Sequence, residues 1–149
     1  MSDKNFKRPE SVLVVVYTLQ GEFLLMERTH PRGFWQSVTG SLEWKETAQA
    51  AAERELFEET GLRAGSALND LRQGKQFPII QPWRKRYAPR VFFNREHWFA
   101  LPLSSRRTIQ LQRSEHRQYR WMNATQAIAR ASSWTNRNAI RLLSSGLSL

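Results

Sequence analysis

Short apolar runs separated by glycine and proline divide the chain into candidate strands. Residues 12–17 are almost entirely apolar, which is typical of a strand buried on both faces. Residues 22–27 follow a turn at Gly21 and are expected to pair with that strand as a hairpin. The remaining segments of this kind predict a third strand at 34–38, stopped by Gly40, and later strands at 96–101 and 118–122.

Three segments carry apolar residues at helical spacing, and they predict helices at 47–60, 124–131 and 136–144. In the first, Ala48, Ala52 and Leu56 fall on one face, and Gly61 can provide the left-handed residue that ends the helix.

Residues 63–90 contain Pro78 and Pro82 and predict a long loop around a short strand. Strands around one early helix, followed by closing helices, predict an α/β sandwich with a mixed sheet. The length of 149 residues fits a single domain over 1–149.

The amino-acid composition excludes several kinds of functional site. The chain has no cysteine, which excludes disulfides, thiolate metal sites and a cysteine nucleophile. A metal ion would therefore be held by oxygen or imidazole groups, which favours a hard cation such as Mg²⁺. The longest apolar run, Val12–Val16, is too short to span a membrane, and residues 1–11 lack a secretory signal. We therefore expect a cytoplasmic protein without a membrane partner.

Acidic residues gather in one part of a basic chain. The net charge is +10, yet residues 43–59 hold six of the 13 aspartates and glutamates. A solvated helix face would be the ordinary explanation of such a run. However, like charges three and four residues apart on a helix repel one another, so a compensating cation is expected.

Glu55, Glu58 and Glu59 are spaced so that a helix brings three carboxylates onto one face. Arg54 lies one turn before Glu58 and can orient its carboxylate, and Gly40 lies where bare backbone can approach a ligand. The pattern predicts a platform of oxygen ligands for Mg²⁺, which commonly binds substrate phosphates as well.

Residues 40–62 also match a family motif at nine fixed positions. The segment resembles the Nudix box, with the matching residues Gly40, Glu46, Arg54, Glu55, Leu56, Glu58, Glu59, Gly61 and Leu62. The resemblance to Nudix hydrolases implies a Nudix-type α/β/α sandwich. It also implies Mg²⁺-dependent cleavage, with Mn²⁺ as a substitute, of a nucleoside diphosphate linked to another group.

The same resemblance implies that Glu55, Glu58 and Glu59 are metal ligands, together with the Gly40 carbonyl. Nudix enzymes often add a glutamate from a later loop, and Glu115 is the candidate here; a surface ion pair is its alternative role. One glutamate would accept a proton from the attacking water. Glu58 is our first choice because of Arg54, with Glu55 and Glu59 as the other catalytic candidates.

The sequence around the box is similar to that of bacterial Nudix enzymes that act on 7,8-dihydroneopterin triphosphate. The similar stretches are KRPESVLVVVY, FWQSVTGSLEWKET, RYAP and SWTNRNAI. The implied reaction releases pyrophosphate and leaves the monophosphate, as in folate biosynthesis, with dATP or other deoxynucleoside triphosphates as slower or alternative substrates.

A triphosphate tail calls for cations and a hydroxyl, and Lys7, Arg28 and Thr39 are the candidates around the box. The apolar stretch of Phe77, Pro78, Ile79 and Ile80 is a candidate lining for the flat ring, or an ordinary strand. Ser133 precedes a helical segment, so it is either a substrate contact or a helix cap.

Two other functions remain open from the residues alone. The basic charge would also suit a general nucleoside triphosphate or RNA 5′-pyrophosphohydrolase. A nucleic-acid-binding module could use the charge together with the six tryptophans. Because three glutamates would repel phosphates unless a cation is bound, we expect a small-molecule substrate and no obligate nucleic acid.

Overall fold

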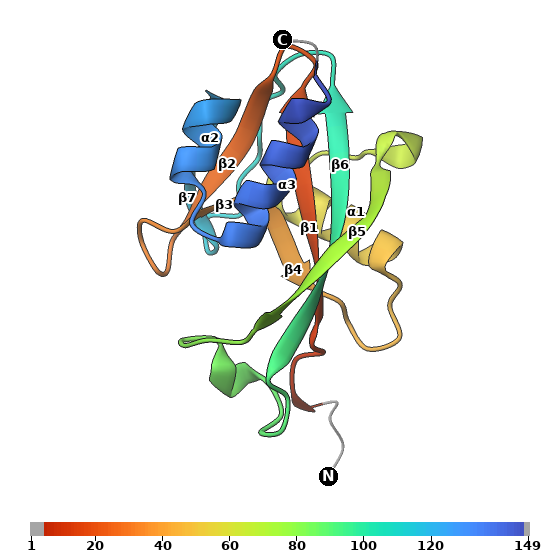
Figure 1. Cartoon of the computed structure of the whole chain (residues 1–149), viewed down its shortest axis with the longest axis vertical. Helices are drawn as coiled ribbons and strands as arrows, with labels where there is room; N and C mark the ends of the chain where they lie inside the picture. Colours follow the sequence, from red (N-terminus) through yellow and green to blue (C-terminus); the bar gives the residue numbers. More distant parts are fainter. Residues whose placement is uncertain (1–4, 148–149) are drawn as a thin grey trace.

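The computed structural model describes residues 5–147. Its strands form one mixed, seven-stranded sheet (Figure 1). They are β1 (Glu10–Thr18), β2 (Glu22–Arg28), β3 (Trp35–Gln36), β4 (Val38–Ser41), β5 (Asn69–Pro78), β6 (Phe93–Leu103) and β7 (His116–Asn123). Strand β1 is central: it runs parallel to β6 and antiparallel to β2 and β4. Strand β5 pairs with β6, while β3 and β7 pair with β2.

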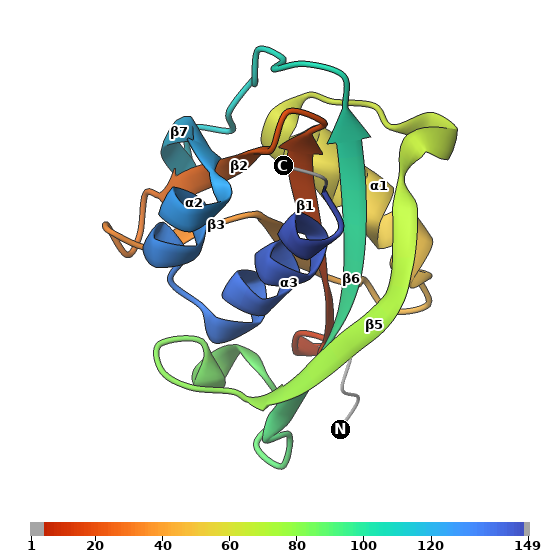
Figure 2. The same ribbon diagram turned by 45° about the horizontal axis from the view of Figure 1, so that its top comes forward.

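Helices cover both faces of this sheet (Figure 2). Helix α1 (Ala48–Thr60) packs on one face through Ala51, Ala52 and Leu56. Helices α2 (Ala124–Arg130) and α3 (Trp134–Ser145) pack on the other through Ala127, Ala139 and Ile140. Two 3₁₀ turns, η2 (Gly65–Ala67) and η3 (Arg84–Arg86), flank β5. These layers confirm the α/β/α sandwich and mixed sheet expected from the sequence.

Two local predictions were wrong. The strand inside segment 63–90 is longer than predicted, because β5 covers ten residues and pairs with β6. Its residues are mostly exposed, so no alternation of apolar and polar positions marks it in the sequence. Gly40 does not stop a strand at 34–38 either; Ser37 divides that segment, and Gly40 lies inside β4, opposite Val12.

Within residues 5–147, no helix combines the length and the apolar character that crossing a membrane requires.

Candidate active site

Both ends of α1 are set by local sequence. Thr47 Oγ1 accepts a hydrogen bond from the backbone N–H of Ala50 (3.1 Å). At the other end Gly61 has φ = 76°, a left-handed conformation that glycine adopts without strain. Since the apolar face of α1 is fixed against the sheet, its glutamates are held along the edge where α1 meets β4 and β7.

The three clustered glutamates differ in exposure. Side chains of Glu55 and Glu59 turn inward, with 12% and 1% of their surface exposed, while Glu58 is 47% exposed. Neither carboxylate oxygen of Glu59 has a hydrogen-bond partner within the described part of the chain. A buried carboxylate without partners is costly, so this position is suited to a cation.

Burial sets the acidity of the inner pair. It raises the pKa of Glu59 well above the usual value, and the neighbouring Glu55 carboxyl raises it further. Burial also raises the pKa of Glu55. Two such carboxyl groups close together favour binding of a divalent cation, whose charge would stabilise both in the ionised form. Gly40 lies directly against the Glu55 carboxylate, with no room between them for a larger side chain at position 40.

Arg54 links the glutamates of this segment. Its guanidinium donates to Glu46 through two nitrogens, each at 2.8 Å, and to Glu55 at 2.8 Å. The contact with Glu58 is longer, at 3.5 Å. The hydrogen bonds to Glu46, above all, raise the pKa of Arg54. Arg54 therefore orients Glu46 and Glu55 more firmly than Glu58, although it contacts all three.

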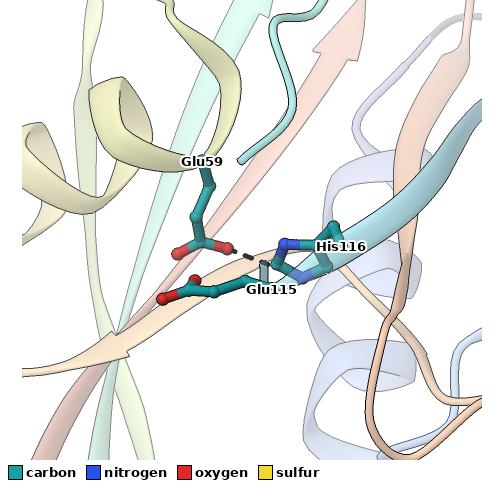
Figure 3. A group of neighbouring side chains, drawn as sticks. All are labelled: Glu59, Glu115 and His116. Carbon is teal, nitrogen blue, oxygen red and sulfur yellow. Dashed lines mark ion pairs between the residues drawn. The ribbon is translucent and has the colours of Figure 1, made fainter. Parts of the chain in front are cut away.

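A second segment adds an acid and a histidine to the same place. Glu59, at the end of α1, meets Glu115 and His116 at the start of β7, with one ligand atom from each lying within 4.8 Å of the others (Figure 3). His116 Nε2 lies 3.9 Å from Glu59 Oε1 and 3.0 Å from Gln36 Nε2. These three side chains could hold a metal ion.

His116 was missed by the sequence reasoning. Burial, assisted by Arg28, lowers the pKa of His116 to about 4, so the imidazole is neutral at physiological pH and can act as a ligand. The only signal in the sequence was its position next to Glu115. Nothing local revealed that β7 would carry it to the end of α1.

Cations border these carboxylates. The backbone N–H of Lys7 donates to the carbonyl of Arg86 (2.9 Å), so the N-terminal segment and η3 lie together. Burial lowers the pKa of the Lys7 ammonium most, and Arg86 lowers it further. Glu55 raises this pKa, but its effect is smaller. Burial also lowers the pKa of Arg28, with Glu115 acting in the opposite direction. Lys7, Arg28 and Arg86 thus share one electrostatic environment with the acidic group.

Thr39 lies in β4 beside this group, and its hydroxyl donates to the carbonyl of Val12 (2.9 Å). The remaining candidates lie elsewhere. Phe77 and Pro78 end β5, opposite Asn94 and Phe93 of β6. Of the next two residues, Ile79 is buried and Ile80 is 63% exposed.

Ser133 begins α3, on the face opposite α1. Its hydroxyl accepts from the backbone N–H of Asn136 (3.2 Å), so it does cap the helix. Lys7, Arg28, Gly40, Glu55, Glu59 and Glu115 are therefore linked to one another by contact or by electrostatic influence, while Phe77 and Ser133 belong to the β5 and α3 side of the sheet.

Comparison with known proteins agrees with this arrangement. The model of the NUDIX domain family matches residues 7–143, and the chain belongs to this family. The protein is 44% identical over 144 residues, 94% of this chain and 95% of the other, to the dihydroneopterin triphosphate diphosphatase of Escherichia coli (strain K12). It is 36% identical over 140 residues, 91% of this chain and 87% of the other, to the Haemophilus influenzae protein of the same name.

Solved structures give the same picture. The E. coli dihydroneopterin triphosphate pyrophosphohydrolase superposes with a TM-score of 0.88 at 41% identity, covering 95% of this chain and 98% of the other. A NUDIX hydrolase from Listeria monocytogenes superposes with a TM-score of 0.79 at 26% identity, covering 94% of each chain.

Proposed function

We propose that this protein hydrolyses 7,8-dihydroneopterin triphosphate to dihydroneopterin monophosphate and pyrophosphate. The observation that carries the proposal is that buried carboxylates on α1 lie next to the basic residues Lys7, Arg28 and Arg86. This arrangement occurs in a chain that is 44% identical, over nearly its whole length, to an enzyme named for this reaction. Slower hydrolysis of dATP or other deoxynucleoside triphosphates is part of the proposal.

The residues that would hold a divalent cation are Glu55, Glu59 and Glu115, with Glu58, His116 and the Gly40 carbonyl as further candidates. The unpartnered oxygens of Glu59 support this set. We expect Mg²⁺, with Mn²⁺ as a substitute. A cation bound there would offset phosphate charge and make a bound water more acidic.

Side chains of the protein bind the phosphates and accept the proton of the attacking water. Lys7 and Arg28 bind phosphate oxygens through charge-assisted hydrogen bonds. A glutamate accepts the proton of the attacking water, and Glu58 is the proposed base because its carboxylate is the exposed one of the three. The water oxygen bonds to phosphorus, the anhydride bond between the α- and β-phosphates breaks, and pyrophosphate leaves.

The test is release of pyrophosphate, with and without Mg²⁺, from a panel of triphosphates. The panel holds dihydroneopterin triphosphate, dATP, 8-oxo-dGTP and 5′-triphosphorylated RNA. We expect the pterin to give the highest kcat/KM. A ten-fold or greater preference for another member would overturn the substrate and favour a general or RNA pyrophosphohydrolase.

A further inference from the structure

A second polar cluster is buried on the sheet face that α3 covers. Glu96 and Asn94 of β6 have only 5% and 2% of their surface exposed, and Ser11 of β1 has 8%. Ser11 is the register partner of Glu96 across the two parallel strands. The cluster is thus built on the central strands of the sheet, and Thr135 at the start of α3 lies next to it.

The hydrogen bonds of this cluster are incomplete. Trp98 Nε1 donates to Glu96 Oε1 (3.0 Å), and Asn94 Nδ2 donates to Ser11 Oγ (2.7 Å). Thr135 of α3 is close enough to lower the pKa of the Glu96 carboxyl. A carboxylate offers about four acceptor positions, so some remain free. In addition, the buried Asn94 Oδ1 has no partner within residues 5–147.

Within residues 5–147, Glu96 is not paired with a cation. Its register partner Lys75 instead places its ammonium 5.9 Å from the centre of the Trp98 ring. Burial raises the pKa of Glu96 accordingly. A buried carboxylate beside an unpartnered amide oxygen presents acceptors to a ligand that carries several N–H donors.

The cluster lies among the candidate ring-binding residues. Phe77 is paired with Asn94 and projects to the same face. Thr135, which interacts with Glu96, is two residues after Ser133. The cluster therefore lies between the end of β5 and the start of α3.

Strand β4 connects this cluster to the carboxylate site. Side chains alternate along β4, so Gly40 faces Glu55 on one side while Ser41 interacts with Tyr87 on the other. Arg86 is next to Tyr87, and its backbone carbonyl accepts a hydrogen bond from the backbone N–H of Lys7. One strand and one short turn thus separate the two regions, and the flexible side chain and triphosphate of the substrate would span them.

We infer that Glu96, with Asn94, is the residue that selects the pterin ring by accepting hydrogen bonds from its 2-amino group and N3–H. This inference rests on the proposed function. The 2-amino-4-oxopyrimidine edge presents two adjacent N–H donors, which match the two oxygens of a carboxylate, and Asn94 Oδ1 accepts from a further ring N–H. Adenine lacks the adjacent donor pair and would leave these buried acceptors unpaired.

The test compares Glu96→Gln with wild type and with Glu53→Gln, a matched change at an exposed position of α1. We measure kcat/KM for dihydroneopterin triphosphate and dATP. Glu96→Gln is expected to lower the pterin-to-dATP ratio of kcat/KM at least ten-fold, and Glu53→Gln to leave that ratio unchanged. An unchanged ratio in a folded Glu96→Gln variant overturns the inference, while a wild type that rejects the pterin overturns the proposed function instead.

A measurement on wild type covers the case in which the variant does not fold. Metal-free protein is titrated with 7,8-dihydroneopterin, which lacks phosphates, and with 2′-deoxyadenosine, while NMR records the Trp98 indole and Asn94 amide resonances. We expect the pterin to shift both resonances and deoxyadenosine to shift neither. Equal responses to the two ligands, or none to the pterin at saturation, would contradict the assignment.

Discussion

Gly40 and Glu55 are in such close contact that a methyl group at position 40 would stand 2.2 Å from the Glu55 carboxyl carbon. The obstructing atoms belong to the end of a flexible side chain, which can move aside. A substitution at Gly40 therefore acts on the position of the carboxylate more than on the fold.

The first prediction is that Gly40→Ala keeps the fold but loses at least about ten-fold in kcat, because displacing Glu55 weakens the proposed metal site. Gly146→Ala is the matched control, since a methyl group there has its nearest neighbour, the Leu143 carbonyl oxygen, at 3.6 Å. Rates and thermal midpoints are measured for both variants. Wild-type activity in Gly40→Ala would show that Glu55 need not hold its observed position.

The second prediction concerns Glu59, whose burial raises its pKa. Glu59→Gln removes a costly buried charge, so its thermal midpoint in metal-free buffer should equal or exceed that of wild type. Turnover with Mg²⁺ should fall by about a hundred-fold or more, since a charge-assisted contact is lost. Addition of Mg²⁺ should raise the midpoint of wild type more than that of the variant. Equal Mg²⁺-induced shifts would remove Glu59 from the ligand set.

The third prediction separates the two roles of Glu115. If this residue contributes to the metal site, Glu115→Ala raises the Mg²⁺ concentration for half-maximal rate, while Glu53→Ala does not. Titrating Mg²⁺ at saturating substrate measures this. Superimposable titration curves for wild type and Glu115→Ala would restore the surface ion-pair role.

The fourth prediction concerns the cations. Lys7→Ala and Arg28→Ala should each lower kcat/KM for both dihydroneopterin triphosphate and dATP by roughly ten- to hundred-fold, or about 1.5–3 kcal/mol. Their ratio should hardly change, because phosphate is common to both substrates. Ile79→Ala should instead alter the ratio, and Arg107→Ala, at an exposed position, serves as the control. Unaffected rates in both cation variants would refute the phosphate-binding assignment.

The fifth prediction is a pH dependence of stability. Hydrogen bonds from Gln118, Gly33 and Arg117 lower the pKa of Glu27 from 4.5 to about 2. The folded state then binds this proton less readily than the unfolded state, so the stabilisation is present above about pH 4.5 and is lost as the pH falls toward 2. The free energy of unfolding of wild type minus that of Glu27→Gln should therefore shrink between about pH 6 and pH 3. A difference independent of pH would contradict this.

Local sequence predicted the parts of this protein that local interactions determine. Helix α1 was predicted within a residue of its observed start because a capping threonine, apolar spacing and a terminal glycine all agree. Strand β5 was underestimated because its exposed residues owe their conformation to β6, a partner distant in sequence.

In the candidate site, too, the sequence predicted what depends on local spacing and not what depends on distant partners. The spacing of Glu55 and Glu59 predicted a carboxylate face, and Glu115 was a candidate only through the resemblance to Nudix enzymes that add a glutamate from a later loop. His116 and Glu96 were not proposed, since their significance depends on register across the sheet. The difference in exposure between Glu58 and its two neighbours likewise depends on how α1 packs, which spacing alone does not determine.

The most direct test of the central claim is kcat/KM of the wild-type protein for dihydroneopterin triphosphate and dATP, measured as pyrophosphate release in Mg²⁺. The account predicts Mg²⁺-dependent formation of dihydroneopterin monophosphate, with the pterin preferred. A preference of ten-fold or more for dATP, or release of single phosphates in place of pyrophosphate, would contradict it.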